Sequence, residues 1–211
     1  LADTVAETAS FLFNDAAAGN TLSFYGSWVA SAAYALQIYY DFSGYSDMAI
    51  GLGSMFGLSI PVNFNAPYLA VSIRDFWRRW HITLSRFLRD YLYIPMGGSW
   101  FGMPRQITAV MITMLLGGLW HGASWQFMVW GGLNGIGLVV YKLWKRISPY
   151  EHSKHWAVRF WKIFNTFLFI TFTRIWFRSE SMENANTLLR QVFRDFNGAI
   201  IPQVLWNYRL V

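Results

Sequence analysis

The sequence predicts an all-α fold, specifically a polytopic transmembrane helical bundle with additional interfacial or re-entrant helices. Of the 211 residues, 55% are hydrophobic and only 13% are charged, which is about half the charged fraction of a soluble domain. Residues 106–141 contain no Asp, Glu, Lys or Arg, and about 20 apolar residues suffice for one helical span. The 12 Trp and 11 Tyr residues suit the two bilayer interfaces, where amphipathic rings settle.

Composition also excludes several kinds of chemistry. The net charge of +6 comes from basic residues that flank apolar runs, so we expect contact with the head groups of membrane lipids and no nucleic-acid partner. The absence of cysteine excludes disulfides, Cys-ligated metals and a cysteine acyl-enzyme. Because the chain begins at Leu1 without a charged leader, we expect no signal peptide and a fragment of a longer protein, without its N-terminal helices.

The N-terminal part of the chain predicts one span followed by a shorter apolar segment. Residues 1–15 are mixed and polar, and we expect them at the surface. Residues 23–40 carry no charge and are long enough to span a bilayer. Asp41 and Asp47 then interrupt the apolar pattern. The following stretch, 48–60, is short for a span, which favours a re-entrant or tilted segment.

Residues 73–93 predict an amphipathic helix that lies in the membrane interface. At 100° per residue, one face of this helix is aromatic and aliphatic, and the opposite face is charged. The apolar face holds Trp77, Trp80, His81, Leu84, Leu88 and Tyr91, and the charged face holds Arg78, Arg79, Arg86, Arg89 and Asp90.

The uncharged run 106–141 is too long for one span, so we expect a helical hairpin or a broken helix that carries His121. Glycines crowd around this histidine, including Gly122. Basic segments flank the run at 74–105 and 142–162. If both are cytoplasmic by the positive-inside rule, the run crosses an even number of times. His121 is then reachable from the far side of the membrane.

Residues 161–177 predict the last span, with Lys162 and Arg174 near enough to its ends to snorkel. The remaining residues, 178–211, predict a surface tail or the approach to a further helix. We find no internal repeat and therefore predict a single domain over residues 1–211.

His121 is the strongest candidate for a catalytic group. An ionisable imidazole inside an apolar run is costly to bury, so a functional role is the favoured interpretation. Trp120 is a rigid apolar wall, and Gly122 lets a backbone or a substrate come close. Desolvation favours the neutral imidazole, which is the state that a general base needs. The alternative is a packed histidine that hydrogen-bonds a neighbouring helix, so the functional hypothesis requires the ring to line an accessible passage.

The other histidines are weaker candidates. His81 lies on the inward face of the predicted interfacial helix beside Trp80, where a plain interface residue is the alternative. His152 and His155 fall in a basic loop and are expected to be solvated. Two histidines without a carboxylate cluster make a poor metal site, because a catalytic zinc usually takes three protein ligands. We therefore expect no metal.

The charged groups near the predicted spans have more than one interpretation. Asp41 and Asp47 are expected to cap helix ends or to pair with arginines, with substrate contact as the alternative. The arginines of the interfacial helix predict lipid head-group contact, although a phosphate-bearing donor such as coenzyme A would use the same charges. The sequence has no GxSxG, GxxxxGK[ST] or HExxH motif, so serine acyl-enzyme, nucleotide-hydrolysis and zinc-protease mechanisms lack support.

Taken together and in this order, five sequence blocks resemble signatures of the membrane-bound O-acyltransferase (MBOAT) family. They look most like its alginate O-acetyltransferase branch, close to the D-alanyl transfer protein of teichoic acid synthesis. The blocks are YYDFSGYSDMAIG at 39–51, FNAPY at 64–68, FWRRWHITLS at 76–85, RDYLYIPMGG at 89–98 and LGGLWHGA at 116–123. They cover about residues 30 to 140, and the flanks fit the same branch more loosely.

This resemblance implies acyl transfer at a membrane-embedded histidine, inside a ring of helices with a tunnel that joins the two membrane faces. His121 matches the histidine that is taken as catalytic in the family, and His81 matches a second important position. The remaining site candidates in these blocks are substrate-binding residues. They are Trp120, Trp80, Arg79, Asp41, Tyr45 and Asp47. No bound cofactor is implied, and the donor is expected to be acetyl-CoA or another acyl thioester.

The leading hypothesis is therefore an O-acetyltransferase that modifies a cell-envelope polysaccharide such as alginate. It is expected to be a multi-pass protein of the bacterial cytoplasmic (inner) membrane, with periplasmic acetyltransferase partners. His121 would act as general base, a contribution of about 10²–10⁴-fold, and His81 would orient the donor or stabilise the oxyanion. The alternatives are D-alanyl transfer to teichoic acid, and a transporter or channel whose histidine relays protons.

Overall fold

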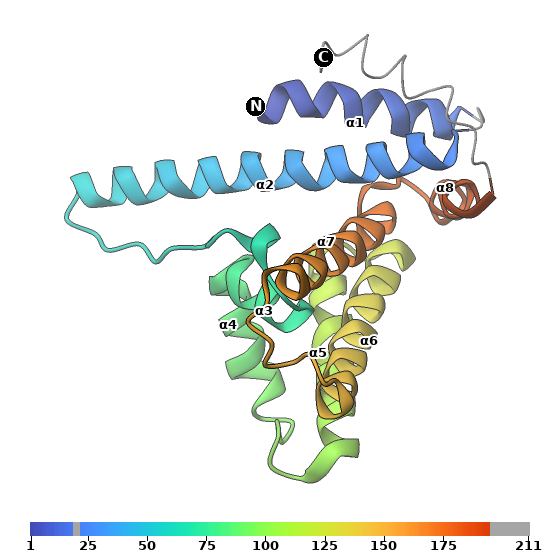
Figure 1. The fold of residues 1–211 in the computed structure, drawn as a ribbon. Coiled ribbons are helices and arrows are strands. Elements are labelled where there is room, and N and C mark those ends of the chain that lie inside the picture. Colours follow the sequence, from blue (N-terminus) through green and yellow to red (C-terminus); the bar gives the residue numbers. More distant parts are fainter. Residues whose placement is uncertain (19–21, 195–211) are drawn as a thin grey trace. The chain divides into compact units, whose positions relative to one another are not determined.

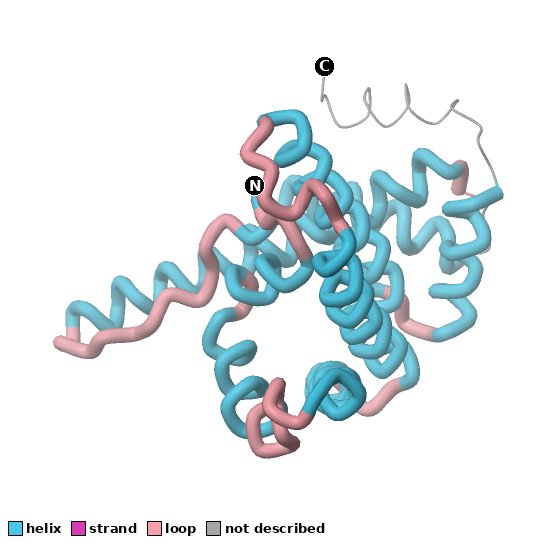
Figure 2. Tube along the Cα trace, turned by 60° about the horizontal axis from the view of Figure 1, so that its bottom comes forward, coloured by secondary structure: helices cyan, strands magenta, loops and turns pink. Residues whose placement is uncertain are grey.

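The computed structural model describes residues 1–18 and 22–194, and within these ranges every regular element is a helix. Figure 2 shows helices joined by loops, without a strand among the described residues. The chain divides into two compact units, Leu1–Phe42 with Thr171–Val211, and Ser43–Ile170. The all-α prediction is thus confirmed for the described residues. The predicted tail 178–211 lies partly outside them.

The first unit contains α1 (Ala2–Ala17), α8 (Met182–Arg194), the start of α2 and the end of α7 (Trp156–Arg178). Phe13 and Tyr34 pack edge to face, with ring centroids 6.1 Å apart. Arg174 is only 2% exposed, and its guanidinium lies 5.3 Å from the centre of the Phe177 ring. The structure corrects the expectation that Arg174 snorkels, because its charge is held against an aromatic face inside the packing.

Helix α2 (Phe24–Met55) runs without interruption through the segment that was expected to separate two apolar elements. Asp41 and Asp47 therefore lie within a helix, and the predicted short element 48–60 does not exist as a separate segment. No proline occurs between 24 and 55, so no backbone donor is lost, and isolated glycines cost a helix only about 1 kcal/mol each. The helix ends at Met55, and Gly57, whose φ is 71°, follows it in a Schellman motif in which the Leu58 N–H donates to the Gly53 carbonyl over 2.8 Å.

The second unit begins within α2, at Ser43, and continues with an extended loop and the short 3₁₀-helix η1 (Pro67–Leu69). It continues with α3 (Ile73–Arg79), α4 (Ile82–Leu88) and the π-helix η2 (Arg89–Tyr93). The single helix expected over 73–93 is thus three pieces, which corrects its predicted continuity; its interfacial position stays a prediction. The break falls at His81, where φ is 41° and ψ is 57°. Neither proline nor glycine is present there, so the cause is tertiary.

Helices α5 (Gly102–His121) and α6 (Trp125–Ile147) form the helical hairpin that was predicted for residues 106–141 (Figure 1). Their backbones approach closely at two glycines. A Cβ on Gly118 would overlap the carbonyl of Phe127, and one on Gly131 would overlap the carbonyl of Met114. This close packing places His121 at the turn of the hairpin.

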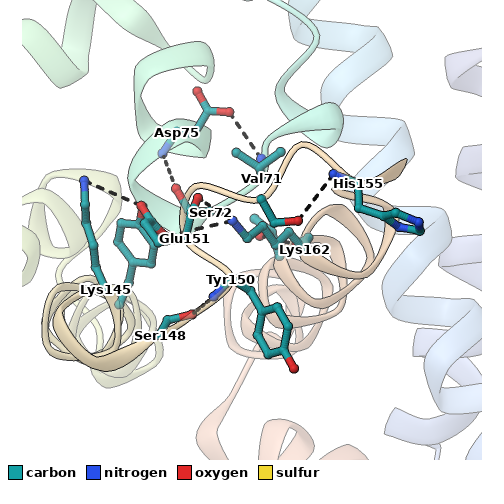
Figure 3. A network of polar contacts seen from close by, with 12 residues as sticks. Val71, Ser72, Asp75, Lys145, Ser148, Tyr150, Glu151, His155 and Lys162 are labelled. Carbon is teal, nitrogen blue, oxygen red and sulfur yellow. Dashed lines mark hydrogen bonds and ion pairs between the residues drawn. The ribbon is translucent and has the colours of Figure 1, made fainter. Parts of the chain in front are cut away.

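A polar cluster fastens the connection between α6 and α7, and Figure 3 shows it at close range. The Tyr141 hydroxyl donates to Glu151 Oε1 over 3.0 Å, and Lys145 Nζ lies 3.5 Å from the same carboxylate oxygen. Lys162 Nζ donates to the Glu151 backbone carbonyl over 2.9 Å. Glu151 thereby holds together the end of α6 and the first turns of α7.

Within the two described ranges, the length and the apolarity that a membrane crossing requires do not coincide in any one helix.

Candidate active site

The second unit contains a cavity of about 630 Å³ that is walled by α3, α4, η2, α5 and α6. Its apolar wall includes Trp77, Met114, Gly117, Trp130 and Leu138, next to the ring of His121. The cavity is large enough for a small-molecule ligand, because such sites typically occupy about 300–1,000 Å³. A histidine and a large accessible volume therefore share one space.

His121 is the last residue of α5 and is half-buried among aromatic rings. Its ring centroid lies 5.0 Å from that of Trp120, 5.2 Å from that of Trp130 and 6.3 Å from that of Phe127. The Trp130 ring stands at 90° to the imidazole. These contacts orient the ring while it also lines the cavity. His121 thus belongs to the lining of a cavity, and its role as a general base stays a prediction.

His81 lies at the junction of α3 and α4 in the left-handed backbone region, which non-glycine residues rarely adopt. The segment before η1 holds it there. The Ile82 N–H donates to the Asn63 carbonyl over 3.0 Å, and the Asn65 N–H donates to the Arg79 carbonyl over 3.0 Å. The imidazole Nδ1 lies 3.2 Å from Asn63 Oδ1. Burial lowers the pKa of His81 below its usual value, so the neutral ring is favoured.

The structure brings the two candidate histidines against one indole. The Trp120 ring centroid lies 6.3 Å from that of His81 and 5.0 Å from that of His121. Trp120 itself is 62% exposed. Whereas His121 lines the cavity, His81 is not among the described lining residues; Ile82 and Ser85, which follow it on α4, are.

The charged residues of the cavity wall are all basic. They are Arg74, Arg78, Arg86, Arg89, Lys142 and Lys145. Two of them have acidic partners outside the wall: Arg89 Nε lies 2.7 Å from Asp90 Oδ1, and Lys145 lies 3.5 Å from Glu151. Because no carboxylate among the described residues belongs to the wall, its electrostatic potential favours an anionic ligand.

Two of the predicted substrate-binding residues have structural contacts instead of cavity positions. Trp80 is 5% exposed and stacks on Phe76, with centroids 5.5 Å apart and planes at 16°. The Arg79 guanidinium pairs with Asp75 over 3.0 Å. These contacts stabilise the junction that presents His81, and direct contact with a substrate stays a prediction for both residues.

The remaining predicted residues lie on α2. Asp41 belongs to the first compact unit, and Tyr45 and Asp47 belong to the second. Among the described residues, the cavity wall does not include Tyr45 or Asp47, and both are exposed. Their predicted role in substrate binding remains untested.

Several cavity residues were not singled out in the sequence. Gln106 and Thr113 lie on α5, and the Gln106 amide donates to the Tyr93 hydroxyl over 2.7 Å. Spacings of three, four and seven residues place side chains on one helix face. Gln106, Thr113 and Gly117 share such a face and lead to His121, so this periodicity in an uncharged run is the signal that could have identified them.

Within the described ranges, no group of three or more His, Cys, Asp or Glu residues could hold a metal ion. His152 and His155 lie in the exposed connection between α6 and α7, where the His155 ring accepts from the Ala157 N–H over 3.3 Å. The described site therefore contains two imidazoles, an aromatic wall and the basic residues of the cavity wall, which we call the basic rim.

The described residues thus form a helical protein with a partly apolar cavity that is lined by a histidine and by basic side chains. The comparison with protein families then gives the particular assignment. The model of the membrane-bound O-acyltransferase family, MBOAT, matches residues 5–180. The chain belongs to this family, and the whole cavity lies inside the matched range.

Individual relatives agree with this assignment. The chain is 44% identical over 190 residues to the peptidoglycan O-acetyltransferase of Helicobacter pylori, an alignment that covers 90% of this chain and 35% of the relative. It is 49% identical over 142 residues to the probable alginate O-acetylase AlgI of Azotobacter vinelandii, which covers 66% and 27%. The teichoic acid D-alanyltransferase of Bacillus subtilis is 29% identical over 164 residues, with 73% and 40% covered. The chain thus spans about a third of the length of these relatives.

Proposed function

We propose that this chain carries the catalytic centre of an O-acyltransferase that moves an acyl group, acetyl in the first instance, from a thioester donor to a hydroxyl of a cell-envelope polysaccharide. The observation that carries the proposal is the position of His121, a half-buried imidazole on the wall of a 630 Å³ cavity with a basic rim. Family membership supports acyl transfer. The names of relatives that act on peptidoglycan and alginate support a polysaccharide acceptor.

The proposed chemistry uses His121 as general base. Its unprotonated ring nitrogen accepts the proton of the acceptor hydroxyl while the hydroxyl oxygen attacks the thioester carbonyl. The tetrahedral intermediate then collapses, the carbon–sulfur bond breaks, and the imidazolium returns its proton to the departing thiolate. General-base assistance of this kind contributes about 10²–10⁴-fold. Holding donor and acceptor together in the cavity contributes further by removing the entropy of encounter.

The basic rim supports a phosphate-bearing thioester, such as acetyl-CoA or another acyl thioester, as the donor. Arginine and lysine are the side chains that bind phosphate most effectively. Arg78 and Arg86 come from two different helices, α3 and α4, and both line the same cavity. A donor whose phosphates meet these residues would direct its acyl end toward the apolar part of the cavity.

The setting of this reaction is also a proposal. We expect a multi-pass bundle in the bacterial inner membrane, with the basic segments on the cytoplasmic side and the acceptor arriving from the other side. The family name and the relatives support a membrane setting. In such an arrangement, periplasmic acetyltransferases would complete the transfer to the polymer.

Replacing His121 tests the proposal. His121→Gln in the full protein, expressed in membranes, should reduce acyl transfer from labelled acetyl-CoA by at least about 10²-fold, because an amide cannot accept a proton at neutral pH. The matched control is His155→Gln, which alters an exposed histidine outside the cavity and should leave the rate unchanged. Near-normal polymer acylation by a stably expressed His121→Gln protein would refute the assignment.

A second candidate function has specific support. The D-alanyltransferase relatives act on teichoic acid by name, and the same cavity would accept a D-alanyl thioester. Labelling membranes in parallel from acetyl-CoA and from a D-alanyl carrier-protein thioester separates the two donors. A transporter or channel is the remaining alternative, and it predicts proton-coupled flux without any acylated product.

A further inference from the structure

The carboxamide of Asn63 occupies an unusual position beside His81, because its oxygen has three hydrogen-bonding neighbours. The Thr83 N–H donates to Asn63 Oδ1 over 3.2 Å, and the Thr83 hydroxyl donates to it over 3.0 Å. The third neighbour is Nδ1 of His81, at 3.2 Å. One side-chain oxygen thus connects the segment before η1 to the first turn of α4.

This arrangement identifies the protonation state of one ring nitrogen. A backbone N–H can only donate, so the Asn63 atom that faces Thr83 must be the carbonyl oxygen and not the amide nitrogen. That oxygen can only accept, so Nδ1 of His81 must carry the hydrogen. In a neutral imidazole one nitrogen is protonated and the other is not. The lone pair of His81 therefore lies on Nε2.

The backbone makes this arrangement rigid. His81 is held at φ 41° by main-chain hydrogen bonds on both sides of it, from Ile82 to Asn63 and from Asn65 to Arg79. Such a backbone conformation persists only where the surroundings over-determine it, and it often marks a functional position. The main chain of Asn63 thus accepts a hydrogen bond from Ile82, the residue after His81, and its side chain lies against the His81 ring.

The charged groups around His81 come from three elements. On α3, Arg79 is paired with Asp75 over 3.0 Å, and Arg78 lines the cavity. On α4, Arg86 lies on the cavity wall. On α5, His121 lies beyond Trp120, whose indole contacts both imidazoles. Burial of the ring disfavours the charged imidazolium, and therefore a second proton on Nε2.

We propose that Asn63 is a positioning residue that holds His81 in the Nδ1–H tautomer, so that the lone pair of the ring lies on Nε2. This inference rests on the proposed acyl transfer and narrows the role of His81. A neutral ring with its hydrogen on Nδ1 has no Nε2–H to donate to an oxyanion. In this tautomer Nε2 can accept a hydrogen bond but cannot donate one, which argues against the oxyanion-stabilising role and leaves orientation of the donor as the role proposed for His81.

The pH profile of acyl transfer tests the proposal. Asn63→Asp keeps the acceptor oxygen and adds a negative charge beside Nδ1, which stabilises the imidazolium. The acidic limb of the plot of kcat/KM against pH should therefore shift to higher pH by about 1–3 pH units. The rate should recover at higher pH. The matched control, Asn65→Asp, places the same charge in the same loop on an exposed side chain two residues further along, and its profile should coincide with that of the unaltered protein. An Asn63→Asp profile that superimposes on the unaltered one would overturn the proposal.

Spectroscopy of the ring supplies a readout that does not need turnover. In the full protein in membranes, the ¹⁵N chemical shifts of His81 should show a protonated Nδ1 and an unprotonated Nε2 at neutral pH. Asn63→Ala should abolish the preference of His81 for the Nδ1–H tautomer. It should also reduce kcat/KM by about tenfold or more at every pH, without shifting the acidic limb of the pH profile to higher pH. A hydrogen on Nε2 in place of Nδ1 in the unaltered protein would refute the inference. If the tautomer is as expected but the protein forms no acyl product, the proposed function fails while the positioning by Asn63 stands.

Discussion

At the residue scale, the two histidines differ in how they are held. Aromatic rings orient His121 through packing, whereas a hydrogen bond and a left-handed backbone orient His81. A fixed acceptor such as Asn63 Oδ1 selects one tautomer of the His81 ring. Under the proposed mechanism, His121 would receive and return the proton, and His81 would keep its lone pair on Nε2.

Burial of His81 has a consequence for stability. Because burial lowers the pKa of His81 in the folded protein, the unfolded chain binds more protons between that lowered pKa and the ordinary value of about 6.5. The contribution of the neutral His81 ring to the free energy of unfolding is thus complete above pH 6.5. It is lost as the pH falls toward the lowered pKa of His81.

We therefore expect His81→Asn to reduce the acid sensitivity of the fold. Asparagine tolerates the left-handed region, and its amide can still donate to Asn63. The decrease in Tm of the detergent-solubilised protein between pH 7.5 and pH 5.5 should be smaller in this variant than in the unaltered protein. His155→Asn is the control, since that ring is exposed. Equal Tm decreases in the unaltered protein and in His81→Asn would contradict the prediction.

At the element scale, the α5–α6 hairpin depends on glycines that permit close backbone approach. Gly118→Ala should lower the free energy of unfolding by about 1–3 kcal/mol, because the new methyl would overlap the Phe127 carbonyl and force the helices apart. Since His121 follows on the same helix, acyl transfer should fall as well. Thermal unfolding and initial rates measured on one preparation test both effects.

Gly132→Ala is the matched control on the same hairpin. Its added Cβ would lie 3.6 Å from Leu115 Cδ2, an ordinary van der Waals contact. Because alanine is favoured over glycine inside a helix by about 0.5–1 kcal/mol, this variant should be neutral or slightly more stable. If both substitutions destabilise equally, close packing at Gly118 is not the cause.

The break between α3 and α4 shows what helical periodicity misses. The pattern over 73–93 is amphipathic throughout, and no proline or glycine interrupts it before residue 93. The interruption comes from Asn63, which lies outside the helix in the sequence and binds the main chain at Ile82 and Thr83. A distant hydrogen-bonding partner has no signature in local periodicity, so one helix was predicted where three pieces form.

At the scale of the whole molecule, the excess positive charge is partly collected on one cavity. The chain carries a net charge of +6, and in the part of the chain that the structure describes, the wall of the cavity contains arginines and lysines but no acidic residue. Interactions in a partly enclosed site are screened less than those on an open surface. The same residues that suggested lipid contact in the sequence thus surround a space that suits an anionic ligand.

Charge reversal in the cavity should therefore weaken donor binding. Arg86→Glu is expected to raise the KM for acetyl-CoA by about tenfold, equivalent to about 1.4 kcal/mol, with a smaller effect on kcat. The increase should shrink as ionic strength rises. Arg159→Glu makes the same charge change at an exposed position outside the cavity wall. Indistinguishable KM values for the two variants would show that the cavity does not bind the phosphates.

By itself, the sequence determined the helical class, the family resemblance, the hairpin around residues 106–141 and the choice of His121. These features are local, because composition, periodicity and short ordered motifs are all read along the chain. Only the tertiary structure decided that His81 breaks a helix, that Asn63 sets its tautomer, that Trp120 contacts both imidazoles, and that basic residues of separate helices share one cavity. Such features depend on groups that are distant in sequence and meet only when the helices pack, so no local pattern encodes them.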